Sequence, residues 1–172
     1  MSQKTHLDEL IDYSSNIISR MANSPEIVAL LLDKDPNSVD LGGDDGDVAR
    51  EHMFDYDYVD DTQLEAGAYI MVDVDMIDSP TGTVKDMEVY VQIVVSKTYM
   101  ELDKKSFKGV KGNRRDNLAR QIDLLLNGSK DFGIGKLSLM SARTANVPKS
   151  FTSKMLTYEV SDFAYTRGAG RR

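Results

Sequence analysis

The chain has 172 residues, with 28 acidic and 21 basic side chains and a formal net charge of −7. It contains no cysteine, which excludes disulfides, thiolate metal sites and cysteine nucleophiles. No stretch approaches the roughly 20 apolar residues that a membrane helix needs, and no signal peptide is visible. We therefore expect residues 1–172 to form a single domain with a core of its own and no membrane partner.

The charge is unevenly distributed along the chain. Residues 1–66 hold sixteen acidic and four basic residues, whereas the remainder holds twelve acidic and seventeen basic residues. Complementary charge on two parts of one chain suits head-to-tail contacts between copies or contacts with a partner. Ordinary solvated surface is the alternative explanation.

Two helices are expected at the N-terminus, the first of them amphipathic. Apolar residues recur at helical intervals from residue 6 to residue 22, after a capping-box spacing of Thr5 and Asp8. Ser24 and Pro25 then signal a new helix start, with a capping side chain followed by proline in the first turn. The run Ile27–Leu32 is apolar on all sides, which predicts a short buried helix.

Residues 33–63 change character and predict a mobile acidic loop. Ten aspartates crowd this segment, which also contains Pro36 and the pair Gly42-Gly43. Charge repulsion and scarce apolar residues disfavour a packed structure. A calcium site was considered at Asp33, Asp35 and Asn37, but Ser38 stands where the sharp turn of such a loop needs glycine.

The pattern then changes to a period of two. Ile70, Val72 and Val74 alternate with polar or larger residues from Ala68 onward, and Val89–Val95 repeats the alternation. The turn around Pro80-Thr81-Gly82 joins these two strands into a hairpin.

A basic connection leads into a third helix. Eight basic residues lie between positions 97 and 120, and Asn113 stands where it can cap the helix, with Asp116 in the first turn. An apolar stripe follows, and the remaining side chains are assigned to the polar face. The stripe is Leu118, Ile122 and Leu125; the polar face is Arg114, Arg115, Arg120, Gln121 and Asp123.

Two further strands complete the prediction, one beginning at Leu137 and one spanning Phe151–Phe163, before a flexible basic tail at 166–172. The predicted order is α-α-β-β-α-β-β. Helices segregated from strands favour an α+β, two-layer sandwich, with a mainly antiparallel four-stranded sheet and helices packed on one face.

No constellation of reactive residues emerges. Asp73 and Asp75 share a strand face, where proximity is expected without any chemistry. His6 and His52 do not have metal-ligand spacing, and His52 is expected to be a solvated side chain. We therefore predict no catalytic residues, no metal and no cofactor. The basic connection could contact nucleic acid through phosphates, but the acidic chain and the absence of a known module disfavour specific binding.

One segment carries a family resemblance. The stretches EVYVQIVVSKTYM at 88–100 and FKGVKGNRRDNLARQIDLLLNGSKDFGIGKLSL at 107–139 resemble the tail terminator, or tail-completion, proteins of long-tailed bacteriophages. The Arg115-Asp116 pair that opens the helix after a sheet hairpin, and the element order, match the family pattern. The resemblance covers about Tyr69 to Phe163 and leaves out the acidic loop and the basic tail.

The resemblance implies a non-enzymatic virion protein, assembled in the host cytoplasm. It would cap the tail tube as a homohexameric ring, end tube growth and provide the head–tail joining surface. Its implied partners are further copies of itself, the tail tube protein and the head–tail connector or neck proteins, with a tail sheath protein as a further candidate. The residues expected to make ring or tube contacts are Lys108, Lys111, Arg114, Arg115 and Asp116. A neck or head-completion protein, or a small phage nucleic-acid-binding or regulatory domain, is the alternative.

Overall fold

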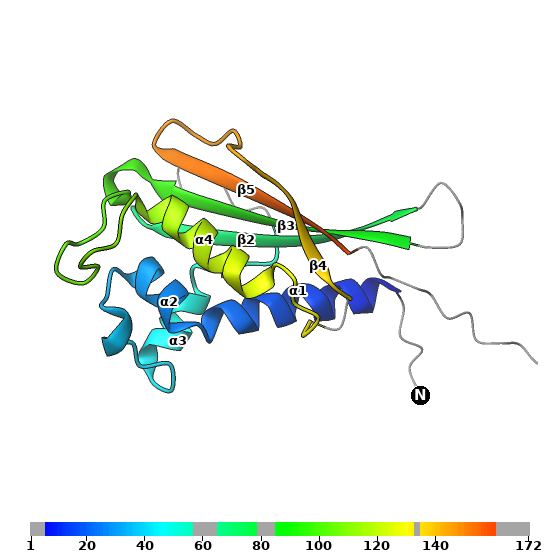
Figure 1. Cartoon of the computed structure of the whole chain (residues 1–172), viewed down its shortest axis with the longest axis horizontal. Helices are drawn as coiled ribbons and strands as arrows, with labels where there is room; N and C mark the ends of the chain where they lie inside the picture. The colour runs from blue at the N-terminus through cyan, green and yellow to red at the C-terminus, as the bar shows by residue number, and fades with distance from the viewer. Residues whose placement is uncertain (1–5, 57–64, 79–84, 133–134, 161–172) are drawn as a thin grey trace, which may run out of the picture.

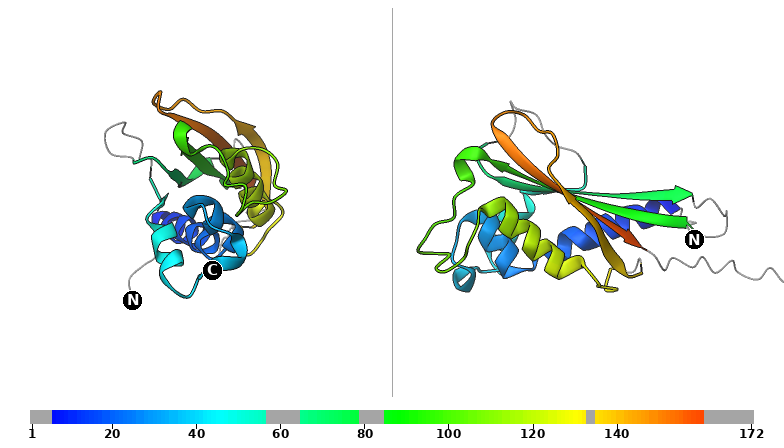
Figure 2. Two further views of the ribbon diagram at one scale, coloured as in Figure 1. Left: turned by 90° about the vertical axis from the view of Figure 1, so that its left-hand side faces the viewer. Right: turned by 45° about the horizontal axis from the view of Figure 1, so that its top comes forward.

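Two layers make up the fold: one sheet, and a set of helices on one of its faces (Figures 1 and 2). This computed structural model describes residues 6–56, 65–78, 85–132 and 135–160. The predicted α+β two-layer sandwich is confirmed. The tail at 166–172 and the end of the predicted last strand, residues 161–163, lie outside the described residues.

The helix layer follows the sequence closely. Helix α1 spans His6–Ala22 and helix α2 spans Pro25–Leu32, as predicted. Ser24 caps α2, with its side chain accepting a hydrogen bond from the backbone N–H of Ile27. Helix α4 spans Arg114–Leu126 and lies across the sheet. Each of these helices buries apolar residues in the core, which is the main source of stability for short helices in proteins, although Leu7 and Ile11 at the start of α1 stay exposed.

Within the described residues, the sheet has five strands rather than the predicted four. Strands β2 (Ala68–Asp78) and β3 (Lys85–Ser96) form the predicted hairpin, followed along the chain by β4 (Leu137–Arg143) and β5 (Phe151–Val160). The spatial order is β1-β2-β3-β5-β4. The added strand, β1 (Met53–Phe54), pairs in parallel with β2, while the other pairs are antiparallel.

The two faces of the sheet differ in composition. Alternate residues of β2, such as Ile70 and Val72, join the main core beneath the helices. The intervening residues face away from the helices, where a smaller apolar cluster forms around Tyr69, Met71 and Phe151. Among the described residues, the helices therefore pack on one face of the sheet, and the other face, which we call the open face, carries this smaller cluster.

The acidic segment is more structured than predicted. It contains a 3-10 helix, η1 (Pro36–Ser38), a short helix, α3 (Asp44–Arg50), and strand β1. Asp45 explains the local order, because it pairs with Lys34 and accepts a hydrogen bond of 3.0 Å from the backbone N–H of Asp40. These two contacts lower the pKa of Asp45, because they stabilise its charged form. The predicted absence of regular structure is thus wrong for these residues. Mobility stays a prediction, and residues 57–63 of the predicted loop lie outside the described residues.

Candidate functional site

The basic loop, residues 100–113, is the part of the chain that sequence reasoning singled out. It follows β3 and the short 3-10 helix η2 (Lys97–Tyr99), and it projects from one end of the molecule (Figure 1). Lys104, Lys105, Lys108 and Lys111 are exposed on it. Gly109 and Gly112 have φ values of 81° and 88°, a left-handed conformation that glycine adopts without strain. The loop therefore presents positive charge on a tightly turned backbone.

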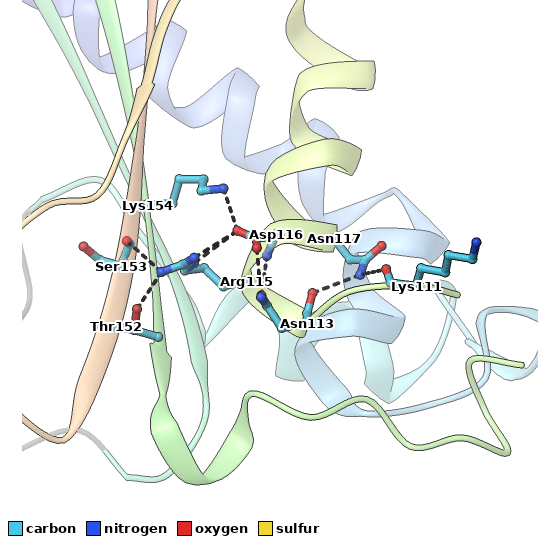
Figure 3. A network of polar contacts seen from close by, with 8 residues as sticks. All are labelled: Lys111, Asn113, Arg115, Asp116, Asn117, Thr152, Ser153 and Lys154. Atoms are coloured by element: carbon cyan, nitrogen blue, oxygen red, sulfur yellow. Dashed lines mark hydrogen bonds and ion pairs between the residues drawn. The ribbon is translucent and has the colours of Figure 1, made fainter. Parts of the chain in front are cut away.

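The loop ends at a cap for α4 (Figure 3). The Asn113 side chain accepts a hydrogen bond of 2.9 Å from the backbone N–H of Asp116 and donates one of 2.8 Å to the Asp116 carboxylate. Asn117 then donates to the backbone carbonyls of Lys111 and Asn113, at 2.9 Å each. The predicted cap is confirmed, and the loop backbone is tied to the first turn of the helix.

Asp116 joins this helix end to strand β5. Its carboxylate pairs with Lys154 at 2.5 Å and with Arg115 at 3.1 Å. Arg115 also donates a hydrogen bond of 2.7 Å to the hydroxyl of Thr152 (Figure 3). Partial burial acts to raise the pKa of Asp116. The hydrogen bonds from Lys154 and Asn113 and the charge of Arg115 outweigh it, so the pKa is lowered. Arg115 and Asp116 are both half-buried, and they bond within the chain.

Arg114 is a correction to the sequence prediction. It was assigned to the polar face of the helix, but its side chain is fully buried. Its guanidinium donates to the backbone carbonyls of Leu30 (2.6 Å), Tyr99 (2.7 Å) and Glu101 (3.0 Å), and it pairs with Asp33. It also lies over the ring of Tyr99, 4.0 Å from the ring centre. Arg114 therefore offers no surface to a partner. Instead it anchors the start of the loop to the end of α2.

The sequence carried a signal for this burial. Arg114, Leu118 and Ile122 are spaced by four residues, so Arg114 lies on the same helix face as the apolar stripe. Two of its partners, Leu30 and Asp33, are 84 and 81 residues earlier in the chain, and only the tertiary fold brings them near. The five residues predicted to make ring or tube contacts thus fall into two groups, one exposed and one bonded within the chain. Lys108 and Lys111 are exposed on the loop. Arg114 is buried and holds the start of the loop, whereas Arg115 and Asp116 bond to β5.

Strands β2, β3 and β5 carry a row of acidic side chains on the open face, which the sequence did not predict. Asp75 lies directly opposite Glu88, and Glu88 lies directly opposite Glu159 on its other side. Asp73, exposed like Asp75, extends the row along β2. Like charges directly opposite each other on neighbouring strands are destabilising. The phenol of Tyr90 donates a hydrogen bond to Glu88, and this contact is the first cause that raises the pKa of Tyr90, to about 12.

The remaining sequence candidates also have defined positions. Asp33 pairs with Arg114, and Asp35 caps η1. His52 is half-buried rather than solvated, because it contacts the Ala68 carbonyl at 3.0 Å and stacks on the ring of Tyr69. In the part of the chain that the structure describes, no group of three or more histidine or acidic side chains is arranged to hold a metal ion. Nor is any described helix long and apolar enough to cross a membrane.

The fold and the site together define an α+β domain with a firmly anchored basic loop at one end and an acidic row on the open face of its sheet. A family model described as YomW matches residues 24–160, and the chain belongs to this phage-derived family.

One solved structure is also similar, a chain described as "Virion of native gene transfer agent (GTA) particle". It is 14% identical, covers 66% of this chain and 79% of its own, and has a TM-score of 0.39. This score is too low for the two folds to be equated. No curated protein matches the chain.

Proposed function

We propose that this chain is a structural protein of a phage-type virion. In particular, we propose that it caps the tail tube as a ring of six copies, ends tube growth and provides the surface on which head and tail are joined. Membership of a phage-derived family supports the virion role. The sequence resemblance to tail terminator proteins supports the particular place in the virion, at the tail–head junction.

The anchored basic loop is the observation that best supports this proposal. A surface that must dock in one orientation needs charged groups on a fixed backbone, because ordering a loop on binding costs free energy. Arg114 fixes the loop where it begins and Asn117 fixes it where it ends, while the lysines between them remain exposed. Exposed charges of this kind guide orientation and encounter more than they supply affinity.

We also propose that the protein acts without catalysis, through shape and charge complementarity. Two carboxylates beside the loop are engaged in ion pairs: Asp116 binds Lys154 and Arg115, and Asp33 binds Arg114. The tail tube protein and the head–tail connector or neck proteins would be its partners, and in a contractile tail the sheath protein as well.

Electron microscopy of purified particles tests the assignment. The expected result is six copies at the tail–head junction, with tails of irregular length when the gene is deleted. A different copy number, or a location elsewhere in the particle, would contradict the terminator role. A position on the head side of the joint would favour a neck or head-completion protein. Retention of DNA by the purified protein at moderate salt, without particle association, would favour a nucleic-acid-binding domain.

A further inference from the structure

Helix α1 carries an exposed apolar flank that the core does not use. Leu7 is 69% exposed and Ile11 is 60% exposed, one helical turn apart on the same flank. Further along the same helix, Ile17 and Met21 are fully buried in the core, so the exposed apolar residues lie where α1 extends beyond it. Adjacent large apolar side chains at a helix surface are typical of a contact site.

Acidic side chains border this flank. Asp8 and Asp12 each follow one of the apolar residues, so they form a second row one helical step around α1, and both are exposed. We define the α1 flank as Leu7, Asp8, Ile11 and Asp12. An apolar centre with a charged border is the usual anatomy of a protein interface.

The basic loop has the complementary composition. Val110 is 44% exposed, and Lys108 and Lys111 lie near it in the loop. An apolar side chain with positive neighbours matches apolar side chains with negative neighbours. In both places the apolar groups can exclude water while the charges select the orientation.

The two surfaces lie at opposite ends of the same molecule. The beginning of α1 lies at one end of the long axis and the basic loop at the other, in Figure 1 and again in the second view of Figure 2. They therefore cannot meet within one chain. Between copies they can meet, and because the two patches differ, each copy keeps one patch free for the next.

We propose that the α1 flank of one chain binds the basic loop of a second copy, with Val110 seated between Leu7 and Ile11. This proposal rests on the proposed ring, because it names the two surfaces that the ring would join. The contact is small, so single contacts between free chains are weak, and closure of the ring strengthens them through effective concentration.

The absence of cysteine allows a clean test. An Ile11→Cys chain is mixed with a Val110→Cys chain of different mass at high protein concentration and oxidised, since a disulfide forms only between closely apposed Cβ atoms. The expected product is the mixed disulfide, at least about tenfold above the yield from a matched mixture of Leu124→Cys and Val110→Cys. Leu124 is the control because it is 67% exposed but lies on α4.

Charge reversal is the second arm. Lys108→Glu with Lys111→Glu should lower the mixed-disulfide yield about tenfold, and adding Asp8→Lys with Asp12→Lys to the partner should restore it. Unchanged thermal unfolding of each variant confirms that the fold is intact. Restoration by the second pair of changes is the outcome that a merely structural role would not produce.

Several results would overturn the inference. One such result is a disulfide formed mainly between two Val110→Cys chains, since it indicates that the basic loop contacts the same loop of another copy. Others are equal yields with the Leu124→Cys control, or no disulfide at the highest soluble concentration. Loss of the disulfide only on removal of residues 166–172 would make the basic tail the partner instead. If tails carry six copies but the Ile11–Val110 linkage does not form, this contact is rejected and the proposed function stands. If the linkage forms but the copy number is not six, the contact stands and the proposed function is rejected.

Discussion

Two regions of this protein differ in how their charged side chains are paired: the buried beginning of the basic loop, and the acidic row on the open face. At the first, the Arg114 guanidinium has partners on every nitrogen, and these partners come from two separate segments, residues 30–33 and 99–101. At the second, Asp75, Glu88 and Glu159 lie side by side with no cation among their direct strand partners. A buried charge needs such complete pairing, whereas an exposed row tolerates repulsion because water and salt screen it. The Arg114 network therefore fixes the position of the loop, whereas the acidic row keeps negative charge on the surface of the sheet.

The largest expected effect is at Arg114. Arg114→Met should lower the free energy of unfolding by about 3–5 kcal/mol, because it leaves three carbonyls and Asp33 without their donor. Urea denaturation measures the loss. Arg114→Lys should recover only a part of it, because an ammonium cannot reproduce the forked geometry. The exposed Arg120→Met is the matched control, with an expected change within about 0.5 kcal/mol. Equal losses at positions 114 and 120 would contradict the buried network.

A similar loss is expected from the apolar side of the same helix. Ile122→Ala should lower the free energy of unfolding by about 2–5 kcal/mol, because Ile122 is fully buried and its truncation leaves a cavity. Leu124→Ala on the exposed side should change it by about 0.5 kcal/mol or less. The same denaturation experiment measures both variants, and comparable shifts for the two would mean that α4 packs through a different face.

A smaller effect of opposite sign is expected in the acidic row. Glu88→Gln should raise the free energy of unfolding by about 0.2–1 kcal/mol, because it removes like-charge repulsion across two strand pairs. The amide oxygen can still accept the hydrogen bond from Tyr90. Added salt should produce part of the same gain in the unsubstituted chain and little in the variant. A loss of stability in Glu88→Gln would show that the row is not repulsive.

The smallest effect concerns the titration of Tyr90. The carboxylate of Glu88, burial and the charges of Asp75 and Asp73 raise the pKa of Tyr90 from 10.0 to about 12. The unfolded chain therefore loses this proton first, so the contribution of Tyr90 to stability is present below pH 10 and declines as pH rises toward about 12. The difference in near-ultraviolet absorbance between the protein and Tyr90→Phe measures the pKa, and Glu88→Gln should shift it downward. An ordinary pKa would contradict the contact.

The periodic elements of this fold could be predicted because their signals are local. Apolar spacing and capping residues gave α1, α2 and α4, and alternation gave the β2–β3 hairpin. Helix α3 has no such signal, since its sequence is DDGDVAR, and its order depends on the Lys34–Asp45 pair. Strand β1 is only two residues long and is defined by pairing with β2. Non-local contacts override weak propensity in both cases.

The candidate site likewise has features that the sequence predicted and features that depend on the tertiary structure. The sequence by itself determined the cap at Asn113 and the basic character of the loop, because capping geometry and local charge depend on near neighbours. Only the tertiary structure decided that Arg114 is an internal anchor while Arg115 bridges to β5, since their partners are distant in sequence. The acidic row likewise required the strand register, which places residues 71 positions apart, such as Glu88 and Glu159, directly opposite each other. Sequence spacing sets the face on which a side chain lies, but packing between elements decides what that face meets.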